Sequence, residues 1–175
     1  MTSPGGRLIA FFTAEDGEAN GVPKELAQPV EGVEVMIWTL RIACVRGRYQ
    51  EDEWVRVVEV DSQTSFYRIH ELIQTTIKFD SDHPFEFVAG RNPRHHSPIF
   101  DDDPESEDDY DSHEDVTLER VFPLPKNLKL YYHFDFGDDW YFEIRRMRGN
   151  PKPPEPGVNY PRVVKSVGRN PRQYG

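Results

Sequence analysis

Residues Leu130–Arg146, LYYHFDFGDDWYFEIRR, decide the fold, because two runs of alternating apolar side chains meet there at an acidic turn. Successive side chains of a strand point to opposite faces, so this alternation predicts two strands that are each buried on one side. Gly137 lies between the runs, where a chain reversal is most easily made by a residue that is free to adopt positive φ. An isolated hairpin is only marginally stable in water. The stretch therefore predicts a β-hairpin whose apolar face belongs to the core.

The outer face of this hairpin is the first candidate for a functional surface. The side chains expected to point into the core are Leu128, Leu130, Tyr132, Phe134, Phe136, Trp140, Phe142 and Ile144. The side chains expected on the outer face include Tyr131, His133, Asp135, Tyr141, Glu143 and Arg145. Aromatic rings and arginine are enriched at protein interfaces. The outer face is thus either a contact surface or a sheet face that a loop of the same chain covers.

Further elements are indicated by the periodicity of the apolar residues. Strands are predicted over residues 36–45, 53–60, 85–89 and 162–167, and adjacent valines at 57 and 58 indicate a bulge in the second of these. Residues 65–78 carry apolar side chains at helical spacing, with Asp61, Ser62 and Thr64 as N-cap candidates. A short helix is expected over 116–122. This order predicts an α+β domain, with a β-grasp-like mixed sheet, one long helix packed on one face and a short second helix.

Three segments resemble the plasmid pRiA4b ORF-3-like family. They are YHFDFGDDWYFEI in the hairpin, RIHELIQTTIKFDSDHPFEF at residues 68–87 and GRNPRQYG at residues 168–175. The matches span residues 36–175. The resemblance implies a common fold but no defined activity, because the family is largely uncharacterised and one branch is described as a mobile-element passenger called a resolvase. Serine recombination requires a nucleophilic serine supported by arginines. Ser3, the earliest serine, lies in a Gly- and Pro-rich arm, so recombination chemistry is not predicted.

The acidic residues are concentrated in one segment. Asp101–Asp115 holds ten acids in fifteen positions and no lysine or arginine, whereas the whole chain has a net charge of −10. Outside this segment acids and bases are equal in number. Like charges spaced more closely than the Debye length repel each other, so the segment is predicted to be an extended solvated loop. The sequence is accordingly divided into an N-terminal arm at 1–35 and one domain at 36–175 that carries an acidic loop at 101–115.

The C-terminal segment has the opposite charge. Residues 145–175 contain eight lysines and arginines against a single acid, Glu155. This basic segment could pair with the acidic loop of the same or a neighbouring molecule, or bind phosphates. Nucleic acid is the less favoured partner, because the recognised DNA-binding motifs are missing and few aromatic residues lie near the lysines and arginines.

The remaining composition indicates a cytoplasmic protein that is not inserted in a membrane. Cys44 is the only cysteine, so the chain has no internal disulfide, and its place on an apolar strand face predicts a buried, unreactive thiol. No apolar run approaches the roughly 18 residues that span a bilayer. The N-terminal apolar patch is too short for a signal peptide.

A second group of polar residues could form a catalytic or metal-binding site instead of a contact surface. His70, His83, Asp138 and Asp139, with His133, Asp80, Asp82 and Asp135, could form a metal or acid–base site if the helix end met the hairpin turn. Their spacing matches no ligand signature, so no metal or cofactor is predicted, and each residue also has a structural use in turns or hydrogen bonds. Asp135-Phe136-Gly137 matches the magnesium-binding triplet of protein kinases, but the other kinase motifs are missing.

The sequence therefore predicts a non-enzymatic binding or interaction module, a monomer or homodimer, whose partner is an unidentified protein or small molecule. A small metal-dependent enzyme or hydrolase that uses the carboxylates and histidines of the hairpin turn is the second hypothesis. A nucleic-acid-associated accessory protein of a mobile element is the third. An interaction module should present a broad aromatic surface, and an enzyme should present a pocket where these groups converge.

Overall fold

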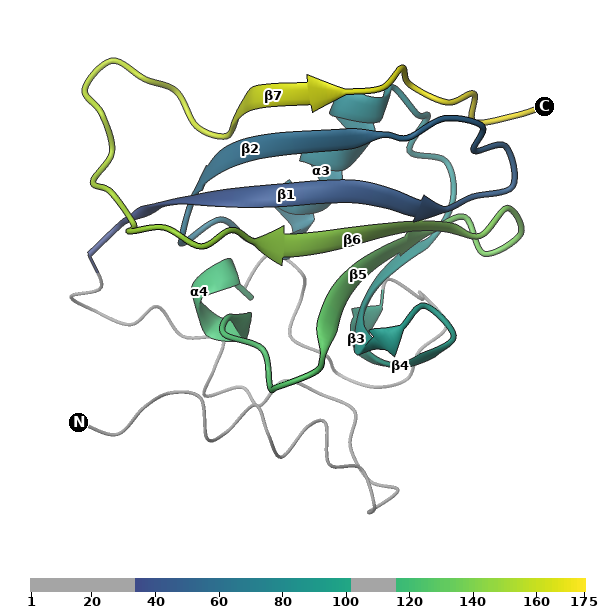
Figure 1. Ribbon diagram of the computed structural model, residues 1–175, viewed down its shortest axis with the longest axis horizontal. Helices are drawn as coiled ribbons and strands as arrows, with labels where there is room; N and C mark the ends of the chain where they lie inside the picture. Colours follow the sequence, from purple (N-terminus) through teal and green to yellow (C-terminus); the bar gives the residue numbers. More distant parts are fainter. Residues whose placement is uncertain (1–33, 102–115) are drawn as a thin grey trace.

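The hairpin lies in the middle of a seven-stranded sheet in the computed structural model, which describes residues 34–101 and 116–175 (Figure 1). The strand order is β4-β3-β5-β6-β1-β2-β7, and all neighbouring strands are antiparallel. The strands are β1 (Ile37–Arg46), β2 (Val55–Asp61), β3 (Phe85–Asn92), β4 (His95–Asp101), β5 (Lys129–Phe134), β6 (Trp140–Arg146) and β7 (Arg162–Val167). The helices are α3 (Phe66–Ile77) and α4 (Leu118–Val121).

The predicted fold class, an α+β, β-grasp-like mixed sheet with one long helix, is wrong. The described residues form an antiparallel sheet with two small helices, of 12 and 4 residues. A mixed sheet would need parallel neighbours, which a helical crossover can supply. Here α3 connects β2 to β3, but β1, β6 and β5 lie between these two strands. The sequence pattern predicted the helix and most strands. It carried no information on the position of each strand in the sheet.

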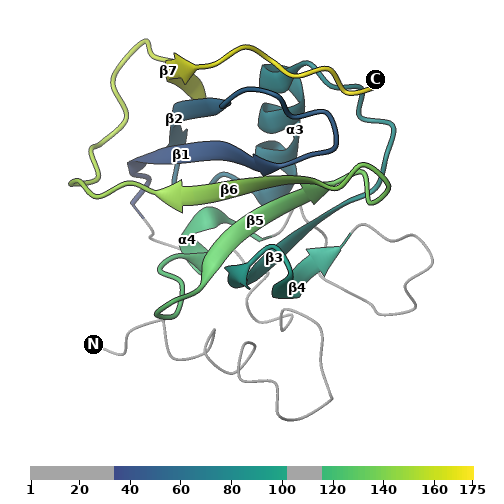
Figure 2. The ribbon, with the colours of Figure 1, turned by 45° about the vertical axis from the view of Figure 1, so that its right-hand side comes forward.

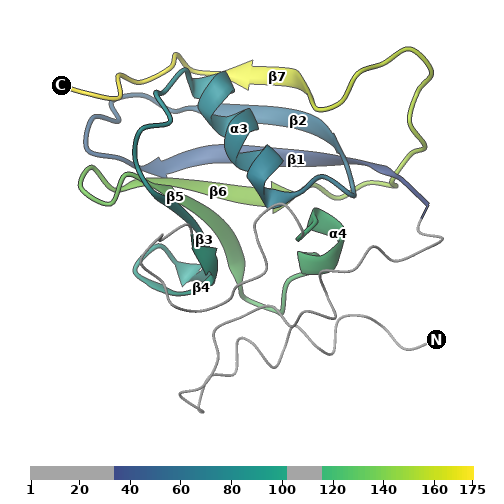
Figure 3. The same cartoon turned by 180° about the vertical axis from the view of Figure 1, so that it is seen from behind.

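The main core lies on the face of the sheet that α3 crosses (Figure 3). Phe66, Ile69 and Ile73 are fully buried against it, as the helical spacing of the apolar residues predicted. The N-cap is Ser65, whose hydroxyl accepts a hydrogen bond from the backbone N–H of Arg68 at 3.4 Å, rather than any of the three predicted caps. A Ser at this position satisfies one of the free N–H groups of the first turn.

The hairpin contributes its predicted inward face to this core. Tyr132 pairs with Phe142 and Phe134 with Trp140, and all four side chains are fully buried. Phe136 is 47% exposed, so its predicted inward orientation is wrong. The prediction for Gly137 is also wrong, because the positive φ angles of the turn belong to Asp135 (54°) and Asp139 (57°). These short polar side chains tolerate the left-handed region better than most residues do.

The opposite face of the hairpin is also buried. Val88, Tyr131 and Tyr141 form a second, smaller apolar cluster there. β4, which is not among the predicted strands, pairs with β3 at this edge of the sheet. Gly90 permits the close approach, because a Cβ at this position would lie 2.2 Å from the carbonyl oxygen of His95.

The other half of the sheet confirms two smaller predictions. The pairing of β2 with β7 shifts register between Val57 and Val58, where adjacent valines indicated a bulge. Cys44 is 6% exposed, and burial raises the pKa of its thiol to about 12, which makes the thiol unreactive at neutral pH. The predicted N-terminal arm up to residue 33 and residues 102–115 of the acidic loop lie outside the described residues. None of the helices that the structure describes has the length and hydrophobicity needed to cross a bilayer.

Candidate functional site

Four connecting segments meet at one end of the sheet, on the right in Figure 1. They are the β1–β2 loop (47–54), the α3–β3 loop (78–84), the β5–β6 turn (135–139) and the C-terminal segment (168–175). We call this region the loop end. Loops held on a rigid sheet are where binding residues concentrate. Six of the eight residues of the hypothetical metal or acid–base site lie here, namely Asp80, Asp82, His83, Asp135, Asp138 and Asp139.

Asp135 shapes the hairpin turn. Its Oδ1 accepts hydrogen bonds from the backbone N–H groups of Gly137 at 3.1 Å and Asp138 at 3.3 Å. Its Oδ2 lies 3.6 Å from Nε2 of His83. This is the Asx-type bonding that carboxylates commonly provide in turns. The helix-to-strand loop and the hairpin turn do meet, as the hypothesis of a polar site required.

The other two acids of the turn contact arginines of the neighbouring strand end. Asp138 Oδ1 lies 3.3 Å from Arg48 Nη1, and Asp139 Oδ2 lies 2.8 Å from Arg46 Nη2. The backbone N–H of Arg48 also donates to the carbonyl of Asp138 at 3.0 Å. These contacts attach the turn to the β1–β2 loop and place a positive charge beside each carboxylate.

His133 joins two carboxylates on the outer face of the hairpin. Its Nδ1 lies 2.7 Å from Glu86 Oε1 and its Nε2 lies 3.1 Å from Asp139 Oδ1. His133 is 6% exposed, and its ring stacks on Tyr141 with centroids 3.9 Å apart. The ring of Phe136 also lies close to it, with centroids 4.7 Å apart. The polar atoms of His133 are thus fully used by protein partners.

Most of the predicted outer surface is buried. Tyr131, His133, Asp135 and Tyr141 are each no more than 6% exposed. Burial, together with the nearby Asp139 and Glu86 carboxylates, raises the pKa of Tyr141 to about 12. Glu143 is partly buried and pairs with Lys129 at 3.0 Å, and Arg145 alone of the six candidates is exposed.

His70 lies on the opposite face of the sheet from His133. The Nδ1 atom of His70 is 2.7 Å from the hydroxyl oxygen of Tyr132, and the same oxygen accepts a hydrogen bond from Gln74 Nε2 at 2.9 Å. The imidazole ring of His70 stacks on Phe85, with centroids 3.8 Å apart. Burial raises the pKa of Tyr132 well above its ordinary value. His70 therefore belongs to a buried polar network under α3, and the structure does not bring it together with His83, Asp138 and Asp139.

His83 belongs to a cluster that the C-terminal segment completes. Tyr174 donates its hydroxyl hydrogen to Asp82 Oδ2 at 2.6 Å, and the hydroxyl oxygen of Tyr174 lies 3.2 Å from His83 Nε2. The bond to Asp82 raises the pKa of Tyr174 to about 12. Among residues 34–101 and 116–175, no three His, Cys, Asp or Glu side chains are grouped so that they could hold a metal ion.

Two side chains fix the C-terminal segment to the domain. Asn170 Oδ1 accepts from Trp54 Nε1 and from Arg56 Nη2, each at 2.8 Å, and its Nδ2 donates to the carbonyl of Thr76 at 3.1 Å. Gln173 Oε1 accepts from the backbone N–H of Asp80 at 2.5 Å, and its Nε2 donates to the carbonyl of the same residue at 3.1 Å. The family-like GRNPRQYG segment is thus an ordered part of the domain.

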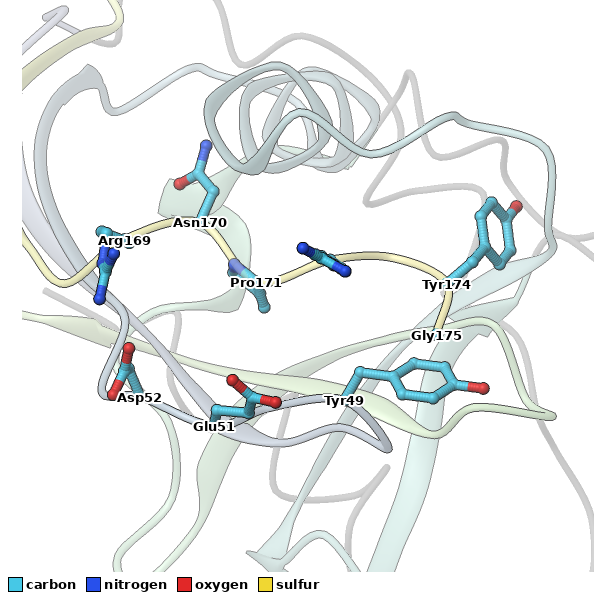
Figure 4. Close-up of a pocket in the computed structure, with 9 residues that line it drawn as sticks. Tyr49, Glu51, Asp52, Arg169, Asn170, Pro171, Tyr174 and Gly175 are labelled. Carbon is cyan, nitrogen blue, oxygen red and sulfur yellow. The ribbon is translucent and has the colours of Figure 1, made fainter.

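A cavity of about 540 Å³ opens between this segment and the β1–β2 loop (Figure 4). We call it the loop-end pocket. Glu51 and Asp52 lie on one side, and the C-terminal segment, with Arg169, lies on the other. Tyr49 and Tyr174 lie together at one end. The remaining lining residues are Asn170, Pro171, Arg172 and Gly175.

Parts of this pocket can be recognised in the sequence, but not that they form one site. Arg169 and Arg172 were counted in the basic C-terminal segment, and GRNPRQYG carried the family resemblance. Glu51, Asp52 and Tyr49 were overlooked, since they lie in a short polar link between two strands. Their only sequence signal is that the link is acidic while the C-terminal segment is basic.

Two of three comparisons with known proteins give a match. A family model described as "Plasmid pRiA4b ORF-3-like protein" matches residues 45–173. The solved structure of MM3350, a protein of unknown function from Methanosarcina mazei Go1, is similar with a TM-score of 0.61 and 21% sequence identity, over 79% of this chain and 72% of that one. At this identity the likeness concerns the fold alone. A search of the curated proteins gives no match.

Proposed function

We propose that this chain, which belongs to the plasmid pRiA4b ORF-3-like protein family, is a binding module that holds a small ligand with both an anionic and a cationic group in the loop-end pocket. The proposal rests mainly on one observation. Two arginines, 169 and 172, share the pocket with two acids, Glu51 and Asp52, and no ion pair joins any of these four within the described residues.

The pocket is suited to such a ligand in size and charge. Its volume of about 540 Å³ is within the roughly 300–1,000 Å³ that small-molecule sites usually have. Guanidinium groups bind carboxylate or phosphate through paired N–H donors. The facing carboxylates would accept hydrogen bonds from an ammonium or amide group of the same ligand.

The scaffold supports a preformed site. Asn170 and Gln173 hold the C-terminal segment with their side chains directed into the domain. Arg169 and Arg172, which alternate with them, are left exposed at the pocket. A site that is already ordered loses less entropy when a ligand binds.

The enzyme hypothesis has less support from the same residues. A general acid or base must be free to exchange a proton with a bound substrate. Asp138 and Asp139 are each paired with an arginine, and Asp135 bonds the backbone of its own turn. We therefore favour binding over catalysis at the loop end.

The test is a thermal-shift and calorimetric screen of the full chain. Free amino acids and dipeptides serve as probes with two charges, and inorganic phosphate serves as the purely anionic probe. We expect at least one two-charge probe to bind, and binding to be lost when Arg169 and Arg172 are both replaced by Ala or when Glu51 and Asp52 are both replaced by Ala.

Arg91 and Arg94, two exposed arginines at the β3–β4 turn, provide the matched control. Their double replacement by Ala should leave binding unchanged. The proposal fails if no two-charge probe binds, or if the pocket variants bind as well as the control does.

A further inference from the structure

A second hollow lies at the other end of the hairpin. Figure 2 shows this end of the ribbon, where β5 begins and β6 ends. The hollow has a volume of about 390 Å³ and runs between the connection from α4 to β5 and the residues after β6. We call it the basic groove. It shares no residue with the loop-end pocket, so binding in this groove is independent of the proposed function.

The floor of the basic groove is apolar. Leu124 and Leu128, from the α4–β5 connection, are only partly buried, and Met147 is 41% exposed. Methionine adapts its shape to different apolar partners and is common on surfaces that bind varied peptides. Concave apolar surface of this kind on a protein marks a place where another apolar group can be buried.

The rim of the groove has a net positive charge, because its lysine and arginines outnumber the acids that line it. Lys129, Arg145, Arg146 and Arg148 line the groove against a single acid, Glu143. Glu143 lies 3.0 Å from Lys129 and 4.0 Å from Arg145, whose side chain is 61% exposed. Arg148 has no ion pair within the described part of the chain.

Arg146 is held in a defined position. Its guanidinium carbon lies 3.8 Å from the ring centroid of Trp38, which is a close cation–π contact. A neighbouring shallow hollow, lined by Trp38 and by residues 146–149, continues the basic groove toward β1. The positively charged surface therefore extends from the basic groove into this hollow beside β1.

We propose that the basic groove binds an acidic peptide segment of a partner protein, with an apolar side chain of the peptide against Leu124, Leu128 and Met147 and its carboxylates against Arg145 and Arg148. Amphipathic peptides commonly bind in apolar grooves with charges at the edge. Nucleic acid suits the groove less well, because single strands stack on aromatic rings and the one aromatic side chain of the lining, Phe122, already packs edge-on against Trp38. The concave shape argues against an anionic membrane surface, which binds protruding apolar side chains.

Fluorescence anisotropy of the full chain with a labelled short peptide that alternates Glu with Leu tests this proposal. A peptide with Ser in place of Leu isolates the contribution of the floor, and single-stranded DNA is the competing class of ligand. We expect the Glu–Leu peptide to bind more tightly than either. Replacing both Arg145 and Arg148 by Glu should weaken binding about tenfold or more, since two attractive charge contacts become repulsive.

The matched control replaces Lys78 and Lys165 by Glu, which changes the net charge equally but at the end of α3 and on the edge strand β7, neither of which lines the groove. Binding in this control should fall by much less, and Met147→Asp should weaken the Glu–Leu peptide while barely changing the Glu–Ser peptide. All replaced residues are exposed, so unchanged melting temperatures are expected.

Three results would overturn the proposal. The first is no binding of the Glu–Leu peptide, or equal loss in the groove and control variants. The second is tighter binding of DNA that depends on the same arginines. The third is self-association of the protein that the groove variant abolishes, because a second copy would then occupy the groove.

Discussion

The imidazole of His133 and the phenol of Tyr141 stack at 3.9 Å between centroids, with an angle of 9° between their planes. This stack lies on the outer face of the hairpin and holds both imidazole nitrogens against carboxylates, Glu86 on one side and Asp139 on the other. A residue that the sequence marked as a surface candidate thus connects β3, β5 and the turn. That the outer face of the hairpin binds a partner stays a prediction.

We expect His133 to contribute strongly to stability through these bonds. His133→Phe keeps an aromatic ring on Tyr141 but leaves the largely buried Glu86 carboxylate without its partner, so a loss of about 2–4 kcal/mol in unfolding free energy is expected. Denaturant unfolding of His133→Phe, Glu86→Gln and the double variant should give a coupling energy of about 1–3 kcal/mol.

The pair formed by the exposed Lys129 and the partly buried Glu143 is the control for that measurement, because Arg145, 4.0 Å from Glu143, remains when Lys129 is replaced. Lys129→Met should change the unfolding free energy by less than about 1 kcal/mol, because solvent screens such pairs. If His133→Phe is as stable as the parent protein, the two hydrogen bonds do not hold the turn.

Two glycines with the same φ of 77° separate backbone strain from lack of space. At Gly157 a Cβ would meet nothing within 4 Å, whereas at Gly168 it would lie 1.6 Å from the carbonyl oxygen of Glu53. Gly157→Ala should cost only the strain of the left-handed region, roughly 1–2 kcal/mol.

Gly168→Ala should cost at least about 2 kcal/mol more than Gly157→Ala, because the C-terminal segment must also move away from the β1–β2 loop. Thermal and denaturant unfolding of both variants measure the difference. Equal losses would show that Glu53 and Gly168 are not in close contact in solution.

The sequence predicted features that depend on local alternation and missed those that depend on distant pairing. Residues 130–146 and 162–167 have strand patterns that need no partner to be recognised. β4 was missed because its sequence, HHSPIFD, contains a proline and lacks alternation, as an edge strand tolerates. The fold class was wrong because the position of each strand in the sheet depends on contacts between segments far apart in sequence.

The same limit applies to the candidate sites. A structural use in the turn was one of two hypotheses for the turn acids. In the structure Asp135 accepts from the turn backbone, and Asp138 and Asp139 contact arginines. The partners Arg46 and Arg48 could not be assigned, because they come from the end of β1 and the loop after it, far from the turn in sequence. The loop-end pocket was missed for the same reason, since its acids and bases are brought together only when Asn170 fixes the C-terminal segment.

Asn170 should be among the most sensitive polar residues of the domain. In Asn170→Ala, Trp54 Nε1 and the carbonyl of Thr76 lose their partner, while Arg56 keeps its bonds to the carbonyls of Val167 and Gly168. Leaving buried polar groups unpaired costs about 1–3 kcal/mol each, so a total loss of about 2–5 kcal/mol is expected.

Asn150, which is exposed and lies after β6, is the matched control. Asn150→Ala should change the unfolding free energy by less than about 0.5 kcal/mol. Limited proteolysis should also cleave the C-terminal segment faster in Asn170→Ala than in Asn150→Ala. A protease-resistant Asn170→Ala variant of unchanged stability would contradict the role assigned to this side chain.

Cys44 should make the stability of the fold fall at alkaline pH. Burial raises the pKa of its thiol from 9.0 to about 12, so the folded chain keeps a proton that the unfolded chain releases above pH 9. The contribution is fully present below pH 9 and is lost as the pH rises toward 12, with a slope of at most about 1.4 kcal/mol per pH unit.

Urea unfolding of the parent protein and of Cys44→Ala between pH 8 and 11 isolates this effect, because the tyrosines titrate equally in both proteins. The difference in unfolding free energy should change steadily in favour of Cys44→Ala above pH 9, and a constant difference over this range would mean that the thiol is accessible to water in the folded state.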